Sequence, residues 1–499
     1  MSAGAQPGTG TAQKNLKIWW ILGVLATAQL MVVLDATIVN IALPTAQKDL
    51  DIPTDDRQWM ITAYSLAFGG LLIIGGRIGD RIGRRTTFLI GVAGFAAASA
   101  LGGLAPTYEV LIAARAIQGA FGALMAPAAL SLLTVTFEGS PARPKAFGIW
   151  GATSGAGGAI GLLLGGFLTE YFSWRWCLLV NLVFAVIAFV GALTLLPKTL
   201  PDRNVKVGPL SAILIAGGLF SIVYGLSHAE TDGWSDPATI ALLVVGLVLV
   251  AAFLVVQGKI RDPLLPLRVI SDRIRGGSLT AILFTGAGIF GVFLFLTYFL
   301  QDTLSYSAME TGLAFLPMVV FLAATSSLTG SQLLPRFGPR NLIVLGMFVG
   351  ALSLVLMTRF NAGTAYFPDV VGPLVIAGIG AGLIFASALG TATLGLLDED
   401  AGVGSSLVST AQQVGGSIGV ALLSTQAASA GSRHLKDLME SLRLTRPTPE
   451  LASEATLAGY HAAFWWSAGI FVLGAIICVF LIPGGRVKLT ERGNAAEAA

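Results

Sequence analysis

The chain has 499 residues, of which 55% are hydrophobic and only 11% charged, and its mean hydropathy is +0.79. Soluble domains carry about 25% charged residues, so this composition excludes an ordinary soluble protein and indicates an all-α polytopic membrane protein. The formal net charge of +3 predicts no nucleic-acid partner, because the Lys and Arg residues fall between the apolar stretches. Cys177 and Cys478 lie inside apolar stretches and predict neither a disulfide framework nor thiol chemistry.

The apolar stretches predict the number of membrane spans. A helix needs about 20 apolar residues to cross the hydrocarbon core of a bilayer. Residues 1–17 contain no such stretch and predict a disordered N-terminal tail rather than a cleavable signal. The fourteen predicted spans are 18–43, 58–76, 87–105, 109–136, 146–169, 176–196, 209–228, 238–257, 276–300, 311–334, 341–358, 370–396, 402–429 and 460–482.

The basic residues predict the orientation of these spans. An even number of spans places both termini on one side, and the segments on that side hold 21 Lys and Arg residues. The short segments on the other side hold four. By the positive-inside rule, both termini are cytoplasmic in the plasma (inner) membrane. One longer outer loop, 430–459, has mixed charge and predicts an amphipathic surface helix.

Two short loops suggest an internal repeat. The segment 76–85 reads GRIGDRIGRR and 331–340 reads SQLLPRFGPR, which aligns Gly83 with Gly338. Repeated halves are typical of secondary transporters. The second copy follows the tenth span instead of the eighth, so an extra helix pair is predicted between two six-helix bundles. The predicted parts are a bundle at 18–196, a linker with the inserted spans at 197–275, a bundle at 276–482 and a cytoplasmic tail at 483–499.

Two charged residues, Asp35 and Arg115, lie well inside predicted spans. Asp35 stands about 25 Å from the cytoplasmic start of its helix, and Arg115 about 9 Å from the outer start of a helix that runs the other way. Because their depths are similar, we expect the two side chains to pair. An ionisable residue inside a membrane indicates a functional site. We expect the pair to couple protons, with a cationic substrate able to replace the proton on Asp35. The alternative is a static ion pair that joins the first and fourth spans.

Three motifs in chain order resemble the major facilitator superfamily, in particular its fourteen-span drug:proton antiporter branch. They are LDATIVNIALP at 34–44, GGRIGDRIGRR at 75–85 and RAIQG at 115–119. The resemblance implies that the second motif is a conformational latch at the cytoplasmic ends of the two bundles, although its arginines also serve as a topology signal. The implied latch residues are Gly76, Asp80, Arg81, Gly83, Arg84 and Arg85.

The fifth span departs from the antiporter pattern. That pattern is Gly-Pro-x-x-Gly-Gly, whereas this chain has Gly161, Leu162, and then Gly165 and Gly166. Proline kinks a helix, so its replacement by Leu162 predicts a fifth helix that is straighter or is bent by its glycines alone. The resemblance implies an antiporter hinge at Gly161, Gly165 and Gly166. The alternative is a seam of close helix packing.

Four polar residues are candidates for the substrate cavity, and each could instead hydrogen-bond between helices. These are Thr37, Asn40, Gln118 and Gln412.

The leading functional hypothesis is a proton-coupled antiporter that exports amphipathic, often cationic drugs or antibiotics. Rival hypotheses are a dedicated exporter of a self-made metabolite or lipid, a nutrient:proton symporter and a non-transporting sensor. The sequence predicts no enzyme, no metal, and no cofactor beyond the proton gradient that drives transport. The expected partners are a small amphipathic substrate, protons and the lipid bilayer, with the chain a monomer. The identity of the substrate and the proton stoichiometry do not follow from the sequence.

Overall fold

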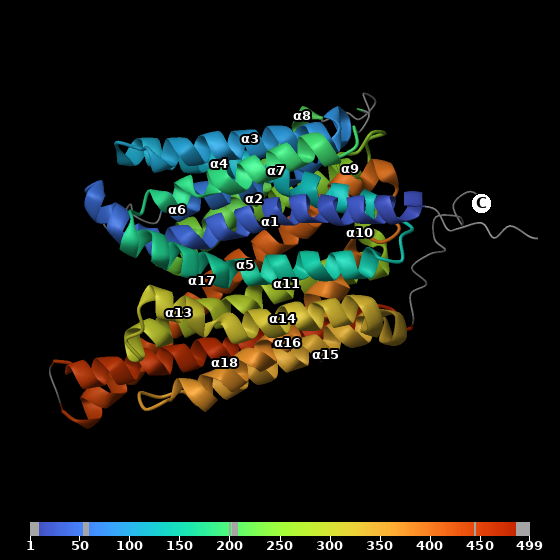
Figure 1. The fold of residues 1–499 in the computed structure, drawn as a ribbon. Coiled ribbons are helices and arrows are strands. Elements are labelled where there is room, and N and C mark those ends of the chain that lie inside the picture. The colour runs from blue at the N-terminus through green and yellow to red at the C-terminus, as the bar shows by residue number, and fades with distance from the viewer. Residues whose placement is uncertain (1–8, 53–58, 199–200, 202–207, 444–445, 486–499) are drawn as a thin grey trace, which may run out of the picture.

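The computed structural model describes residues 9–52, 59–198, 201, 208–443 and 446–485. Within these residues all regular structure is helical (Figure 1), as the composition predicts. The end of the molecule where the positive-inside rule places the cytoplasm is its inner end.

The first half of the chain forms one helix bundle, blue to green in Figure 1. In this bundle α1 packs against α4, α5 and α7, and α4 packs against α2 and α3. Its helices are α1 (Thr9–Asp49), α2 (Trp59–Ile82), α3 (Arg84–Gly103), α4 (Tyr108–Thr136), α5 (Arg143–Tyr171), α6 (Trp176–Leu179) and α7 (Asn181–Leu195).

The second half forms another bundle, yellow to red in Figure 1, whose helices run alongside the first. Several of its spans contain short π-helical segments, at Gly291–Phe295, Phe299–Thr303, Thr329–Leu333 and Tyr366–Val370. Its α-helices are α11 (Arg273–Phe290), α12 (Leu296–Tyr298), α13 (Ala308–Ala314), α14 (Leu316–Leu328), α15 (Leu334–Met357), α16 (Val371–Ala392), α17 (Ala401–Ser441) and α18 (Pro449–Leu481).

The two bundles repeat one packing pattern. In the first, α1 packs on α5 and α7, and α3 packs on α4 and α7; in the second, α11 packs on α17 and α18, and α15 on α16 and α18. The contacts between bundles match as well, because α5 packs on α14 and α16 while α17 packs on α2 and α4. This correspondence supports the repeat inferred from the two loops.

A helix pair lies between the halves in sequence. The helices α8 (Pro209–Thr231) and α9 (Pro237–Gln257) pack on each other, and α8 also contacts α2 and α17, one helix from each bundle. A short helix, α10 (Leu267–Ser271), comes next at the inner end. The predicted inserted spans 209–228 and 238–257 therefore form a helix pair, of which α8 borders both bundles.

The predicted number of spans is not confirmed. Twelve segments of the described residues are long and apolar enough to cross a membrane, so the predicted fourteen are not confirmed. One of the twelve, Met309–Met357, covers two predicted spans, 311–334 and 341–358, which a backbone kink at Gly338 separates. The helix α17 contains the predicted span 402–429 but is not one of the twelve, because many of its residues are Ser, Thr, Gln and Gly.

Two predicted terminal and loop segments also differ. The first helix begins at Thr9, so residues 9–17 are helical rather than disordered, and residues 1–8 lie outside the described part of the chain. Residues 430–459 do not form a separate surface helix, because α17 continues to Ser441 and α18 begins at Pro449. The two helix ends project as a hairpin, red at the lower left of Figure 1.

The aligned glycines of the repeat share one backbone conformation. Gly83, between α2 and α3, has φ 95°, and Gly338, at the kink before the main part of α15, has φ 74°. Residues other than glycine rarely adopt a positive φ. Each glycine thus allows the chain to turn from one span into the next at the inner end, which explains why both loops contain it.

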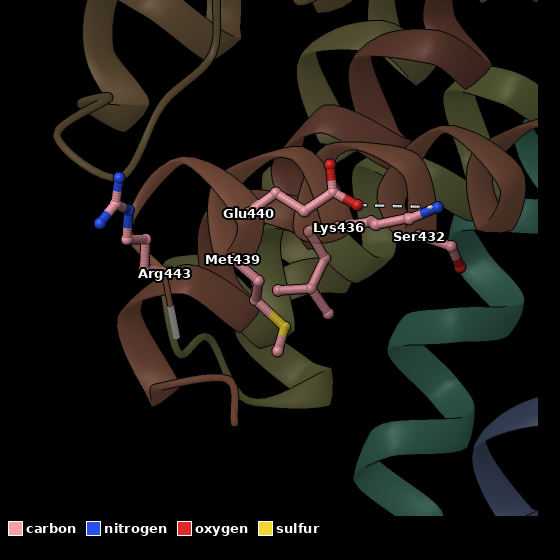
Figure 2. Close-up of a pocket in the computed structure, with 6 residues that line it drawn as sticks. Ser432, Lys436, Met439, Glu440 and Arg443 are labelled. Atoms are coloured by element: carbon pink, nitrogen blue, oxygen red, sulfur yellow. Dashed lines mark ion pairs between the residues drawn. The ribbon is translucent and has the colours of Figure 1, made fainter. Parts of the chain in front are cut away.

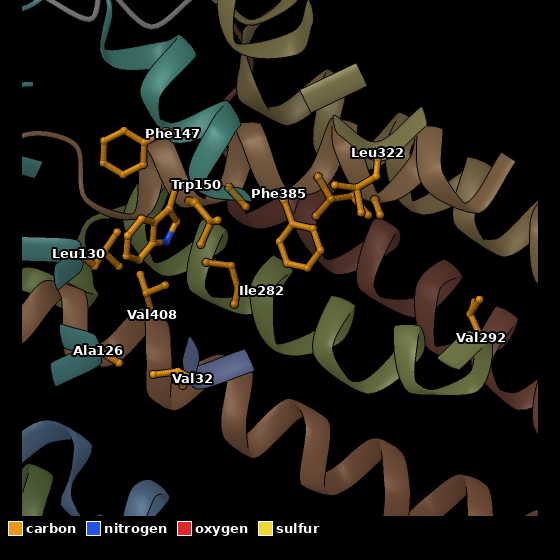
Figure 3. Packing of buried hydrophobic residues seen from close by; sticks show 14 of the residues in the cluster. Val32, Ala126, Leu130, Phe147, Trp150, Ile282, Val292, Leu322, Phe385 and Val408 are labelled. Atoms are coloured by element: carbon orange, nitrogen blue, oxygen red, sulfur yellow. The ribbon is translucent and has the colours of Figure 1, made fainter. Parts of the chain in front are cut away.

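An apolar layer from both bundles closes the inner third of the interface. Trp150 comes seven residues after the start of α5, and Phe385 seven residues before the end of α16, so each lies about 10 Å from its inner end. Figure 3 shows them with Ile282 of α11 and Val408 of α17 in one buried group. Opening the inner end requires this layer to separate.

The crossing of α2 and α4 supplies a test of packing in the first bundle. A Cβ atom at Gly75 would lie 2.1 Å from the carbonyl oxygen of Ala123, whereas one at Gly23 of α1 would have no neighbour within 4 Å. We expect Gly75→Ala to lower the free energy of unfolding by about 1–3 kcal/mol, the usual cost of overpacking. Gly23→Ala should not lower it, because alanine favours a helix interior more than glycine does. Thermal unfolding of the purified variants in detergent measures both, and equal midpoints would contradict the crossing.

Candidate functional site

The predicted ion pair is present. Arg115 Nη1 of α4 lies 2.6 Å from Asp35 Oδ2 of α1, and the two residues are 1% and 0% exposed. The similar depths of the two residues in antiparallel helices predicted this contact, and the prediction is confirmed. A fully buried ion pair needs further hydrogen bonds to offset its desolvation.

Polar side chains from three helices supply those hydrogen bonds. Gln118 Nε2 donates to Asp35 Oδ1 at 2.8 Å, and Asn181 Nδ2 donates to the same oxygen at 2.7 Å. Both amides also donate to Ser99 Oγ, each at 3.0 Å. Arg115 donates to Gln118 Oε1 at 2.7 Å, which closes the network. Gln118 is thus a partner of the ion pair. This arrangement does not support its predicted place in a substrate cavity.

The helix α2 holds Arg115 from the other side. Arg115 Nε donates to the carbonyl oxygen of Met60 at 3.0 Å, and its guanidinium carbon lies 4.5 Å from the centre of the Tyr64 ring. The carboxylate, the aromatic face and the carbonyl together surround the cation. The Tyr64 hydroxyl is buried and has no hydrogen-bond partner among the described residues.

The network lies inside the first bundle. Its side chains come from α1, α3, α4 and α7, and the main contacts between the bundles are those of α5 with α14 and α16 and of α17 with α2 and α4. Asp35 has no exposed surface. A substrate between the bundles would therefore not touch Asp35 in this conformation, so the hypothesis that a drug replaces its proton directly is not supported by this geometry.

The other cavity candidates lie elsewhere. Thr37 Oγ1 donates to the carbonyl oxygens of Val33 and Leu34 within α1, at 3.1 Å each, and faces Gly161 of α5. Gln412 is half-buried on α17, where its backbone carbonyl oxygen approaches Gly286 of α11. The side chain of Asn40 lies outside the described part of the structure. The structure therefore does not bring the four candidates together.

The glycines of the predicted hinge pack against α1. A Cβ atom at Gly161 would lie 1.9 Å from Thr37 Oγ1, and one at Gly165 would lie 2.9 Å from a side-chain carbon of Ile38. Gly166 is buried beside them, and α5 runs as one helix through Leu162. These contacts favour the packing-seam alternative for Gly161 and Gly165.

A second row of glycines on α5 faces the other bundle. A Cβ atom at Gly148 would lie 2.7 Å from the carbonyl oxygen of Ser326, and one at Gly155 would lie 2.5 Å from Leu322. Gly151 approaches Phe385 of α16 in the same way, at 3.0 Å. One face of α5 is thus fitted to α1 and another to the second bundle.

The predicted latch joins the two bundles at the inner end. Asp80 Oδ1 of α2 accepts a hydrogen bond at 3.2 Å from the backbone N–H of Gly402, in the first turn of α17. A Cβ atom at Gly76 would lie 2.5 Å from the carbonyl oxygen of Gly402, so the approach requires a residue without a side chain. The carboxylate meets the positive end of the α17 dipole, a favourable arrangement.

The arginines of the latch motif have different environments. Arg84 Nε lies 3.6 Å from Asp80 Oδ1, and Arg81 is exposed. Arg85 donates to the carbonyl oxygens of Ala192 and Leu193 at the end of α7, at 3.3 and 2.8 Å. Arg85 therefore caps the end of a helix in its own bundle.

The segment before α11 strengthens the inner end. Arg77 Nη2 of α2 donates to the carbonyl oxygen of Pro263 at 3.0 Å. Arg268 of α10 lies 2.9 Å from Asp400 Oδ2, just before α17. Burial raises the pKa of Asp400, and the nearby Arg268 opposes that shift. The linker is therefore tied to α2 and to the start of α17.

The surface hollows in the structure are separate from these sites. Figure 2 shows a shallow hollow along the projecting end of α17, where Lys436 and Glu440 form an ion pair at 3.7 Å. None of its lining residues belongs to the ion-pair network or the latch. Among the described residues no group of His, Cys, Asp and Glu could hold a metal ion.

Sequence reasoning missed several partners of the predicted site. Asn181 begins α7 in an otherwise apolar stretch, NLVFAVIAFVGALTL, so an amide at a span end was its only signal. Ser99 and Tyr64 are residue types common in any membrane helix. Gly402 contributes a backbone N–H, which no side-chain pattern reveals.

A helical membrane protein whose two halves repeat one packing arrangement, with a buried ion pair in one half, has the features of a secondary transporter. The family model of the Major Facilitator Superfamily matches residues 25–420. The chain belongs to the major facilitator superfamily. This membership confirms the predicted family and identifies the chain as a multi-pass membrane transporter rather than an enzyme.

Individual relatives agree with this assignment. The puromycin resistance protein pur8 of Streptomyces alboniger is 44% identical over 480 residues, covering 96% of this chain and 94% of that protein. The cephamycin export protein CmcT of Amycolatopsis lactamdurans is 34% identical over 478 residues, covering 95% and 94%. The human organic anion transporter MFSD10 (TETRAN) has a similar fold, with a TM-score of 0.60 over 92% of this chain and 99% of that chain, at 16% identity.

The ion pair gives a test of mutual dependence. Arg115→Gln leaves the Asp35 carboxylate buried without its cation, so we expect a loss of about 3–5 kcal/mol in the free energy of unfolding. Asp35→Asn combined with Arg115→Gln removes both charges and should recover most of that loss. Thermal unfolding of the single and double variants measures the coupling. Additive effects in the double variant would contradict an energetic pair.

Proposed function

We propose that the chain is a proton-coupled antiporter that exports amphipathic, often cationic drugs or antibiotics from the cytoplasm across the plasma (inner) membrane. It works as a monomer in the lipid bilayer with both termini cytoplasmic. Its fourteen spans form two six-helix bundles and the inserted pair α8–α9. The proton gradient drives transport, and no cofactor is needed. The names of pur8 and CmcT, a resistance protein and an export protein, support export as the direction of transport.

The buried network around Asp35 is the observation that carries this proposal. A carboxylate can carry a proton if both of its states find partners. The charged state has Arg115, Gln118 and Asn181. The neutral state needs an acceptor for its new O–H, and the Oδ1 atom of Asn181 is buried without a donor among the described residues. This arrangement suits a group that changes protonation during transport better than a static ion pair.

The position of Asp35 indicates how proton and substrate interact. Because the network lies inside the first bundle, the proton and the substrate do not compete for one carboxylate in this state. Protonation instead frees Arg115 from its counter-ion and changes the contacts of α1, α2 and α4. The substrate lies at the interface between bundles, where repeat-built transporters place it. Coupling is then conformational.

A dedicated exporter of one compound is the alternative that the relatives favour, because the name of CmcT specifies cephamycin. Transport of a panel of compounds in inside-out vesicles, with and without a pH gradient, separates the two. A drug exporter moves several unrelated compounds, whereas a dedicated exporter moves one. Transport of no compound, or transport unaffected by the gradient, would refute proton-coupled drug export.

The role of Asp35 gives the sharpest prediction. We expect Asp35→Asn to abolish substrate accumulation driven by a pH gradient while the protein still inserts, because the amide cannot bind and release a proton. Asp35→Glu should retain part of the activity. Gln29→Asn is a matched polar substitution on α1, where Gln29 contacts Ser154 of α5 outside the network. Accumulation by Asp35→Asn vesicles against a substrate gradient would show that Asp35 does not couple protons.

The latch at Asp80 gives a prediction about rate. Asp80→Asn weakens the contact with the start of α17, which exists when the inner ends are closed. The ratio of closed to open populations should fall by a factor that the energy of this contact limits. An energy of about 1–3 kcal/mol corresponds to roughly 5–150-fold. We expect substrate affinity within a few-fold of the parent and slower transport. Equilibrium binding and initial transport rates measure the two effects. A parent-like transport rate would leave Asp80 with no role in the cycle.

A further inference from the structure

A second arginine bridges the inner ends of the two bundles. Arg143 begins α5 and is 8% exposed. Its Nη1 atom donates to the carbonyl oxygen of Thr134 at 3.3 Å, and its Nη2 atom donates to the carbonyl oxygen and the hydroxyl of Thr393, at 3.0 and 3.2 Å. Thr134 lies in the last turn of α4, in the first bundle, and Thr393 directly follows α16, in the second.

The electrostatics of these helix ends explain the contact. The last carbonyl groups of an α-helix lack partners within the helix and carry partial negative charge. The planar guanidinium of arginine can donate to several such oxygens at once. The Phe147 ring, 4.9 Å from the guanidinium carbon, covers one face of the cation. Arg143 therefore lies at the negative ends of two helices, one from each bundle.

Arg143 and Asp80 form complementary contacts with neighbouring helices of the second bundle. Asp80 places a carboxylate at the positive start of α17, and Arg143 places a guanidinium at the negative end of α16. Both charged side chains come from the first bundle. The repeat does not reproduce the Asp80 contact, because the position aligned with Asp80 in the second loop is Pro335.

We propose that Arg143 is a positioning residue that holds the inner end closed and, with Asp80, controls how often that end opens. This role rests on the proposed function as an alternating transporter and adds an oppositely charged latch to it. Rocking of one bundle against the other separates the inner ends. A hydrogen bond of 3.0 Å from α5 to Thr393 does not survive that separation, so its energy belongs to the closed state alone.

The chain offers a matched control at the same helix end. Arg275 of α11 donates to the carbonyl oxygens of Leu394 and Gly395, at 3.2 and 3.1 Å, just beyond α16. Arg275 belongs to the second bundle, as α16 does. Arg275→Gln thus removes a cation from this helix end without removing a contact between bundles.

The experiment measures the conformation of purified protein without transport. Spin labels are attached to Thr86→Cys, on the first turn of α3, and Gln332→Cys, near the inner end of the second bundle, where both side chains are exposed. Cys177 and Cys478 are first replaced by Ala. Pulsed electron paramagnetic resonance then gives the populations of short and long distances, which report closed and open inner ends.

We expect Arg143→Gln to raise the ratio of open to closed populations at least about fivefold, the lower end of usual coupling energies. Arg143→Lys keeps the charge but not the forked geometry and should shift the ratio less. Arg275→Gln should match the parent. Thr393→Val removes one acceptor and should produce a small shift in the same direction, which provides a milder test if Arg143→Gln does not fold.

Two results would overturn the proposal. Parent-like distances in all foldable Arg143 variants and in Thr393→Val would show that Arg143 does not hold the inner end. Equal shifts in Arg143→Gln and Arg275→Gln would show a general effect of lost charge. The distances are measured without a substrate or a pH gradient. They therefore test the role of Arg143 even if proton-coupled export is refuted.

Discussion

The pairing of Asp35 with Arg115 is the constraint around which the first bundle is built. Burying both charges costs several kcal/mol unless their remaining hydrogen-bonding groups are satisfied. The structure satisfies them with Gln118, Asn181 and Ser99, so α1, α3, α4 and α7 are held to one another by polar contacts as well as apolar packing. A bundle fixed in this way moves as a unit, and conformational change is left to the surfaces between bundles.

The two glycine rows of α5 show how one helix serves both requirements. Gly161 and Gly165 let α5 lie against α1 inside the bundle, whereas Gly148 and Gly155 let it lie against α14 of the other bundle. Small residues allow close helix contact in membranes, where the hydrophobic effect does not drive helix association. Smooth backbone surfaces on the second face also oppose relative movement less than interlocking side chains would.

The depth of a charge and the apolar periodicity are properties that a sequence displays directly. They predicted the helices and the Asp35–Arg115 contact, whereas the repeat was inferred from two similar loops and the latch at Asp80 from the family resemblance. Contacts made by backbone atoms or by commonplace residues are not displayed in this way. The amide of Asn181 and the N–H of Gly402 were therefore missed. Arg85 was grouped with the latch because it belongs to the same motif, although it lies on α3 and donates to the end of α7. The count of fourteen spans is not confirmed, because α17 is too polar to count as a span by its composition and Met309–Met357 counts as one segment.

The helix α2 connects the buried ion pair with the latch. At its outer end the carbonyl oxygen of Met60 accepts a hydrogen bond from Arg115, and near its inner end Asp80 meets α17. The two positions are 20 residues apart, about 30 Å along a continuous helix. A change in the partners of Arg115 therefore acts on one end of a rigid element whose other end touches the second bundle. In the proposed cycle this gives the proton on Asp35 a physical route to the inner gate without contact between proton and substrate.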